Sequence, residues 1–157
     1  MKIEFYPMRT DEARGYQAGG PDAYGLVPEP RISDGVGVPC RHCLRMVPAG
    51  VGYLVLAHRP FAALQPYAET GPVFLCATPC DAAVPGADLP ECLDSVTYIL
   101  RGYGADDRIV YGTGRVVPTL YLAVAAQALL AMPGVSYAHV RSAANNCYQV
   151  GIRPGPA

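Results

Sequence analysis

The sequence predicts an α+β protein, with a mostly antiparallel β-sheet and one long buried helix at about residues 118–132 packed on it. Three observations indicate this class. Short segments rich in β-forming residues outnumber helical segments, and two of them flank a hairpin turn. Only one long apolar segment, TLYLAVAAQALLAM, has the length and the bounding prolines of a helix.

The first half of the chain predicts three strands and one irregular segment. Within residues 1–8, Ile3 and Phe5 alternate with Glu4 and Tyr6, which is typical of a half-buried strand. Residues 18–39 are dense in Gly, Pro, Asp and Ser, so we expect irregular structure there. The segments VGYLVLAHRPF (51–61) and GPVFLC (71–76) are rich in β-formers and predict two strands.

The second half predicts a hairpin, the long helix and two final strands. SVTYILRGY (95–103) and RIVYGTGRVV (108–117) flank GADD, which is a strong turn signal. The helix begins at Pro118-Thr119 and ends before Pro133-Gly134; being apolar nearly all round, it is expected to be buried on more than one side. Strands over 136–143 and 147–153 are joined by a turn at Asn145-Asn146.

Length and composition limit the function classes. The 157 residues suit a single domain, 1–157, and 51% hydrophobic against 16% charged residues excludes a disordered chain. A formal net charge of −1 gives no basic surface for nucleic acid or for an anionic membrane. The longest apolar run is too short to cross a bilayer, and no signal peptide is visible, so we expect a cytoplasmic protein. A small anionic molecule is the expected partner, and a homo-oligomer is compatible with the sequence.

Six cysteines in a cytoplasmic protein are expected to be reduced thiols or metal ligands rather than a disulfide framework. Cys40 and Cys43 form a C-x2-C pair in PCRHCL, and Cys76 and Cys80 form a C-x3-C pair in CATPC. Together the two pairs would supply the four ligands of a zinc site, although more than thirty residues separate them. Cys40 and Cys43 alone would suit thiol–disulfide exchange, and buried inert thiols are the third interpretation.

A second set of polar residues is predicted on neighbouring strands. Alternation along SYAHVRSA places Tyr137, His139 and Arg141 on one face. Arg101 lies in another strand, and it would converge with His139 and Arg141 if the two strands are neighbours. Such a face would form the wall of a pocket for a small anion, and the alternative is a solvated sheet surface. Glu69, in the tight loop PYAETGP, is a candidate general base or an ion-pair partner for one of the arginines.

Several segments together resemble the DUF1203 family, a group of small bacterial proteins of uncharacterised function. They are VPCRHCL (38–44), HRPF (58–61), PYAETGPVF (66–74), YILRGY with IVYG, and YAHVRSAANNCY (137–148). The resemblance runs from about residue 35 to the C-terminus and brings no activity or cofactor. The family pattern commonly has histidine where this chain has Cys76, which implies a ligand or pocket role for that position.

These observations lead to one leading hypothesis and two rivals. The leading hypothesis is a small-molecule-binding or enzymatic domain with no cofactor. Its predicted catalytic residues are His139, His42 and Glu69, and its predicted ligand-binding residues are Arg41, Arg101, Tyr137 and Arg141. The first rival is a non-enzymatic domain whose structural zinc is held by Cys40, Cys43, Cys76 and Cys80. The second rival is a thiol–disulfide oxidoreductase that uses Cys40 and Cys43.

Overall fold

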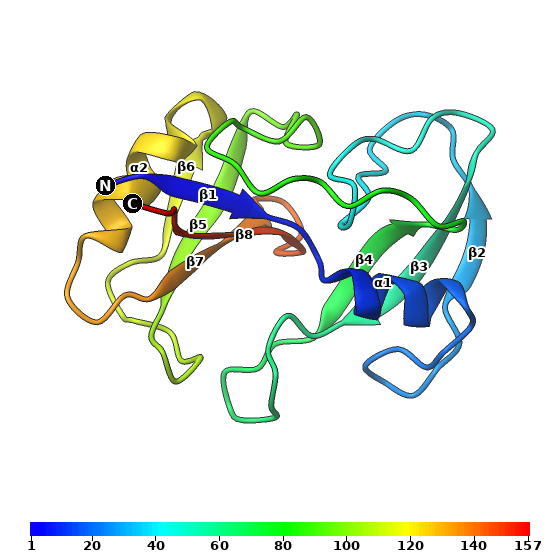
Figure 1. Ribbon diagram of the computed structural model, residues 1–157, viewed down its shortest axis with the longest axis horizontal. Coiled ribbons are helices and arrows are strands. Elements are labelled where there is room, and N and C mark those ends of the chain that lie inside the picture. The colour runs from blue at the N-terminus through cyan, green and yellow to red at the C-terminus, as the bar shows by residue number, and fades with distance from the viewer.

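The computed structural model describes all 157 residues and consists of two antiparallel sheets that lie side by side (Figure 1). The larger sheet has the order β1-β8-β7-β5-β6 and the smaller has the order β2-β3-β4. The strands of the larger sheet are β1 (Ile3–Tyr6), β5 (Thr97–Tyr103), β6 (Arg115–Pro118), β7 (Tyr137–Ser142) and β8 (Tyr148–Pro154). Those of the smaller sheet are β2 (Glu29–Ile32), β3 (Gly52–His58) and β4 (Gly71–Cys76). The α+β class and the antiparallel pairing predicted from the sequence are therefore confirmed, with two sheets in place of one.

The helix on the larger sheet is shorter than predicted. A 3-10 turn, η1 (Thr119–Tyr121), precedes α2 (Leu122–Leu130), so one long helix over 118–132 was wrong. The helix stops because the amide of Met132 bonds back to Leu129, Pro133 has no amide hydrogen, and Gly134 adopts a φ of 84°.

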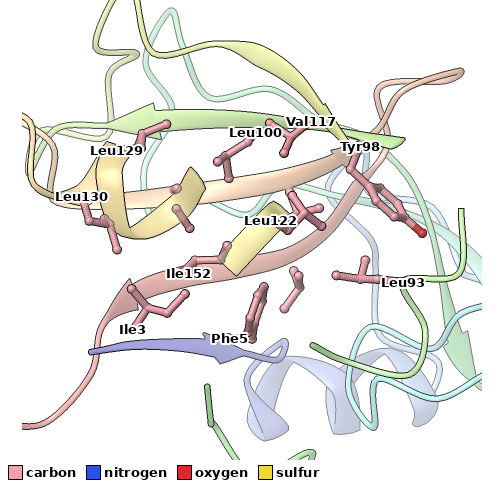
Figure 2. Close-up of a cluster of buried hydrophobic side chains, with 14 of the residues drawn as sticks. Ile3, Phe5, Leu93, Tyr98, Leu100, Val117, Leu122, Leu129, Leu130 and Ile152 are labelled. Carbon is pink, nitrogen blue, oxygen red and sulfur yellow. The ribbon is translucent and has the colours of Figure 1, made fainter. Parts of the chain in front are cut away.

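Only one side of α2 is buried, against the expectation of burial on more than one side. Leu122, Ala126, Leu129 and Leu130 pack on strand residues such as Leu100 and Ile152 (Figure 2). Val124 on the outer side is 65% exposed. This cluster is the larger of two hydrophobic cores, and the second lies between the smaller sheet, the 38–47 segment and the helix α1 (Thr10–Gln17).

Two elements were not expected from the sequence. Helix α1 is polar and buries only Ala13, so it lacks the apolar periodicity that marks a helix, although Asp11 and Glu12 suit its first turn. Strand β2 lies inside the predicted irregular segment 18–39. All four of its residues are exposed and it contains Pro30, as an edge strand can.

The hairpin prediction is confirmed in its pairing: β5 and β6 are antiparallel neighbours. Strand β6 begins at Arg115, however, so a longer connection than GADD joins them, and it includes an isolated bridge between Tyr103 and Ile109.

The face of the larger sheet that points away from α2 carries polar residues in one row. Across the strands Tyr6 lies opposite Gly151, Gly151 opposite His139, and His139 opposite Arg101. The smaller sheet and the connection that follows β3 cover this face: the ring of Phe61 contacts His139 at a centroid distance of 5.2 Å. The boundary between the two sheets is therefore polar and aromatic rather than a continuation of either core. No helix in the structure has both the length and the apolar character needed to span a membrane.

Candidate functional site

Four cysteine sulfurs converge at one point next to the smaller sheet. Those of Cys40, Cys43, Cys76 and Cys80 all lie within 4.8 Å of one another. The sulfur of Cys40 lies 3.8 Å from that of Cys80, and the sulfur of Cys43 lies 3.9 Å from that of Cys76, so each contact joins one cysteine of the first pair to one of the second. The two sequence motifs thus form one cluster, in spite of the hydrophobic strand β3 between them.

Local backbone geometry points the first pair inward. The amide of Leu44 donates to the carbonyl of Cys40 at 3.0 Å, which closes a tight turn, and Leu44 takes a left-handed φ of 56°. A leucine in this conformation is unfavourable by about 1 kcal/mol, so surrounding contacts must hold it there. The turn lies beside β4 because the amide of Arg41 donates to the carbonyl of Phe74 at 3.1 Å. Strand β4 ends at Cys76, which brings the second pair to the first.

The sulfur spacing matches a tetrahedral zinc site. With Zn–S bonds of about 2.3 Å, tetrahedral geometry places the sulfurs about 3.8 Å apart. Cys40–Cys80 and Cys43–Cys76 already have this spacing, and no other pair exceeds it by more than about 1 Å, because all lie within 4.8 Å. A disulfide would instead need a sulfur–sulfur distance of about 2.05 Å, and all six cysteines are free thiols.

The protonation of the four thiols also favours a cation. Hydrogen bonds from Cys43 and Cys76 lower the pKa of Cys40, so its sulfur becomes the preferred thiolate. Cys43 and Cys76 each have a hydrogen bond with the Cys40 sulfur, and this bond raises the pKa of both thiols, most strongly that of Cys76. Burial raises the pKa of Cys80 to about 12. One thiolate is therefore stable in the cluster alone, and a divalent cation is what would stabilise four.

Hydrogen-bond donors surround the cluster. The amide of Cys76 donates to the sulfur of Cys40 at 3.3 Å. The Nδ1 atom of His42 lies 3.2 Å from the sulfur of Cys80, and its Nε2 atom lies 2.9 Å from the hydroxyl of Thr10. When the Thr10 hydroxyl donates to Nε2, Nδ1 carries the proton and donates to sulfur, as an outer-shell partner of a metal ligand does. His42, predicted as an acid or base, thus lies at the cysteine cluster.

Helix α1 holds the loop that carries Cys80. Arg14 donates to the carbonyl of Cys80 at 2.8 Å, and Gln17 donates to the carbonyls of Cys76 and Thr78 at 2.9 and 3.2 Å. A helix that the sequence did not reveal therefore fixes the second cysteine pair.

The two arginines of the predicted pocket meet at Glu69, which pairs with both. Glu69 accepts from Arg101 at 2.7 Å and lies 3.0 Å from Arg141. The Arg141 side chain is only 4% exposed, and its Nε and Nη2 atoms are buried without hydrogen-bond partners. Glu69 is thus an ion-pair partner for both arginines, which is one of the two roles expected for it.

His139 lies directly opposite Arg101 but in an aromatic setting. Its ring contacts Tyr103 and Tyr148 at centroid distances of 4.6 and 4.8 Å. Burial, together with Arg141 and Arg101, lowers its pKa well below 6.5, so the imidazole is neutral at pH 7. Tyr137 on the same face stacks on Tyr103 and donates to Asp107 at 2.7 Å, which ties it to the hairpin connection.

Arg41 lies apart from Arg101 and Arg141. Its buried guanidinium donates to the carbonyls of Tyr148 at 2.6 Å and of Pro39 at 2.8 Å, and it forms no ion pair with a carboxylate. The residues predicted to form one pocket are therefore distributed over three places: the cysteine cluster, the Glu69 ion pairs, and the His139 ring cluster.

Sequence reasoning missed two residues that join His139. His58, at the end of β3, is 3% exposed, and its ring lies 5.9 Å from that of Tyr148. Burial, with Arg41 and Arg59, lowers the pKa of His58 to about 4. Nothing local in the motif HRPF indicates that His58 lies beside Tyr148 of β8.

Comparison with known proteins gives one match. A family model described as a protein of unknown function, DUF1203, matches residues 37–153. No curated protein and no solved structure gives a significant match. The matched range includes all four clustered cysteines, Glu69, and the polar strand β7. Because the match covers most of the chain, this protein belongs to the DUF1203 family.

Proposed function

We propose that this protein is a zinc-binding protein in which Cys40, Cys43, Cys76 and Cys80 hold one structural Zn²⁺ ion. The single observation that carries the proposal is the convergence of four sulfurs within 4.8 Å, with cross-pair contacts of 3.8 and 3.9 Å. Isolated buried thiols pack as small apolar groups and have no reason to gather four at a time from two distant segments. Four thiolates also leave no coordination position open, so the role is structural rather than catalytic.

The charge of such a site has a counterpart in the fold. One Zn²⁺ ion with four thiolates carries a net charge of about −2, which is costly to bury without compensation. Arg41 stands between the first two ligands and is buried without a carboxylate. Burial lowers its pKa, while attraction to the ionised forms of Cys92, Cys147, Tyr148 and, least of the four, Cys40 offsets part of that effect. Arg41 is thus placed to compensate the cluster, with its own donors satisfied by two carbonyls.

The metal would join three segments of the fold. These are the 40–44 turn, the end of β4, and the loop that leaves Cys80. The same loop continues through residues 82–85 along the larger sheet, where Gly86 pairs with Phe5. Zinc would therefore stabilise the contact between the two sheets as well as the smaller sheet itself.

The rival use of Cys40 and Cys43 as a redox pair has less support. In the cluster each of the two also contacts a cysteine of the other motif, Cys40 with Cys80 at 3.8 Å and Cys43 with Cys76 at 3.9 Å. The turn that carries them is closed at Leu44 and is not followed by a helix, whose N-terminus would stabilise a reactive thiolate.

The test is metal content together with thiol protection. Protein purified without chelators should contain about one zinc per chain by elemental analysis. Four of its six thiols should react with a thiol reagent only after the metal is removed. Cys43→Ser should lower both the zinc content and the number of protected thiols. Cys147→Ser is the matched control, because Cys147 is also half-buried but lies outside the cluster.

Two outcomes would overturn the proposal. One is zinc-free protein that still fails to bind added Zn²⁺ when fully reduced. The other is equal loss of zinc in Cys43→Ser and Cys147→Ser, which would place the metal elsewhere or make it nonspecific.

A further inference from the structure

A large cleft runs between the two sheets, at a place distinct from the cysteine cluster. Its volume is about 720 Å³, within the range of small-molecule sites. His58, His139 and Tyr148 form its inner end, and Phe61, Pro60 and Pro85 are among its apolar lining. The N-terminal part of α1 forms another side.

At the inner end of the cleft, one imidazole nitrogen has no hydrogen-bond partner and another has only a long contact. His139 is 1% exposed, and its Nδ1 atom is buried without any hydrogen-bond partner. His58 receives one long contact of 3.3 Å, from the hydroxyl of Tyr16 to its Nδ1 atom. Buried polar side chains in native proteins are nearly always satisfied, so the unpartnered Nδ1 atom of His139 at the end of a cleft indicates a missing ligand.

The charges near this inner end are predominantly positive. Behind it, the guanidinium groups of Arg101 and Arg141 share a single carboxylate, that of Glu69, and the buried Arg41 has no carboxylate partner. At the rim the arginines are already neutralised, because Arg9 pairs with Asp11 at 2.8 Å and Arg153 pairs with Glu4. Glu12 is the rim carboxylate without an ion pair.

We propose that this cleft binds a small organic carboxylate, with the carboxylate group between His58 and His139 and an apolar body against Phe61. Imidazole N–H groups donate to the carboxylate oxygens, and the buried arginines behind them stabilise its charge. A dianionic phosphate suits the site less well, because no unpaired guanidinium lines the inner end. The proposal does not depend on zinc, since none of the four cysteines lines the cleft.

Benzoate is a suitable probe, with benzamide and benzylammonium as neutral and cationic counterparts of the same shape. The three histidine rings are followed by NMR in protein of measured zinc content. Benzoate should shift the His58 and His139 signals with a Kd of about 1 mM, as expected of a ligand this small. The signal of His42, whose ring contacts Cys80, should move much less. Benzamide should bind more weakly, and benzylammonium should not bind at the two rings.

Two substitutions with opposite expected effects protect the test from simple misfolding. His58→Leu should weaken benzoate binding at least about tenfold, because it removes a donor and an aromatic wall. Glu12→Gln should tighten it by about two- to fivefold, because a like charge at the rim is removed. Glu91→Gln, at an exposed carboxylate outside the cleft, should leave affinity unchanged.

The proposal is overturned if saturating benzoate leaves both cleft histidines unmoved while the protein is folded. It is also overturned if benzylammonium shifts the same signals more strongly than benzoate, or if Glu12→Gln weakens benzoate binding. Zinc content is measured on the same sample, so failure of this site and failure of the zinc site are distinguishable.

Discussion

Replacing Glu69 by glutamine tests how the two buried arginines are balanced. Glu69 is the only carboxylate that pairs with Arg101 and Arg141, at 2.7 and 3.0 Å, and their side chains are 17% and 4% exposed. Removing one partner of a fully buried ion pair costs about 3–5 kcal/mol because a charge is left uncompensated. Glu69 itself is 35% exposed, so solvent reduces the effect. We expect Glu69→Gln to lower the free energy of unfolding by about 2–3 kcal/mol.

The measurement is urea denaturation at pH 7, followed by circular dichroism. Glu4→Gln is the matched control, because Glu4 pairs with Arg153, whose side chain is 50% exposed, and should cost about 0–1 kcal/mol. Replacing the uncompensated arginine in the double variant Glu69→Gln, Arg141→Met should recover part of the loss. If Glu69→Gln costs no more than Glu4→Gln, the arginines have another counter-charge and our account of this face is wrong.

Three further predictions concern the interior. Burial lowers the pKa of His58 from 6.5 to about 4, so the unfolded chain binds a proton at this residue at a higher pH than the folded protein does. The free energy of unfolding should therefore fall by up to about 1.4 kcal/mol per pH unit between pH 6.5 and 4. Urea denaturation at several pH values should show a shallower pH dependence for His58→Gln than for the unsubstituted protein. His42→Leu removes the donor to Cys80 and should weaken zinc binding about 10- to 100-fold in competition with a chelator. Gly151→Ala would make its Cβ collide with the ring of Tyr6 and should cost about 1–3 kcal/mol in thermal unfolding, whereas Gly114→Ala, with open space around it, should be nearly neutral.

Most of the strands could be predicted from the sequence because the signal for them is local. β3, β4, β5 and β7 combine β-forming residues with turn residues at their ends, and both properties are visible within about ten residues. Helix α1 could not be predicted this way, because its stability comes from hydrogen bonds to distant carbonyls at Cys76 and Cys80 rather than from an apolar stripe. The end of α2 at Leu130, two residues before the predicted end, could not be read from the sequence, because it is set by the backbone geometry of the last turn before Pro133.

The candidate site residues likewise include some that local sequence signals place correctly and others that only tertiary packing brings together. Strand alternation correctly places Arg101 and His139 on one face, because the period of a strand is fixed by its backbone. The cysteine cluster needed tertiary information: Cys43 and Cys76 are separated by 33 positions, and only the return of β4 beside the 40–44 turn brings them together. The ion pairs of Glu69 and the contact of His58 with Tyr148 likewise arise from the packing of one sheet on the other.

X-ray absorption at the zinc edge on purified protein tests the central claim most directly, because it reports the type and distance of the metal's ligands. The four-cysteine cluster predicts a first shell of four sulfur atoms at about 2.3 Å, with no nitrogen or oxygen ligand. A first shell containing nitrogen or oxygen, or protein that binds no zinc when all its thiols are reduced, would contradict the account.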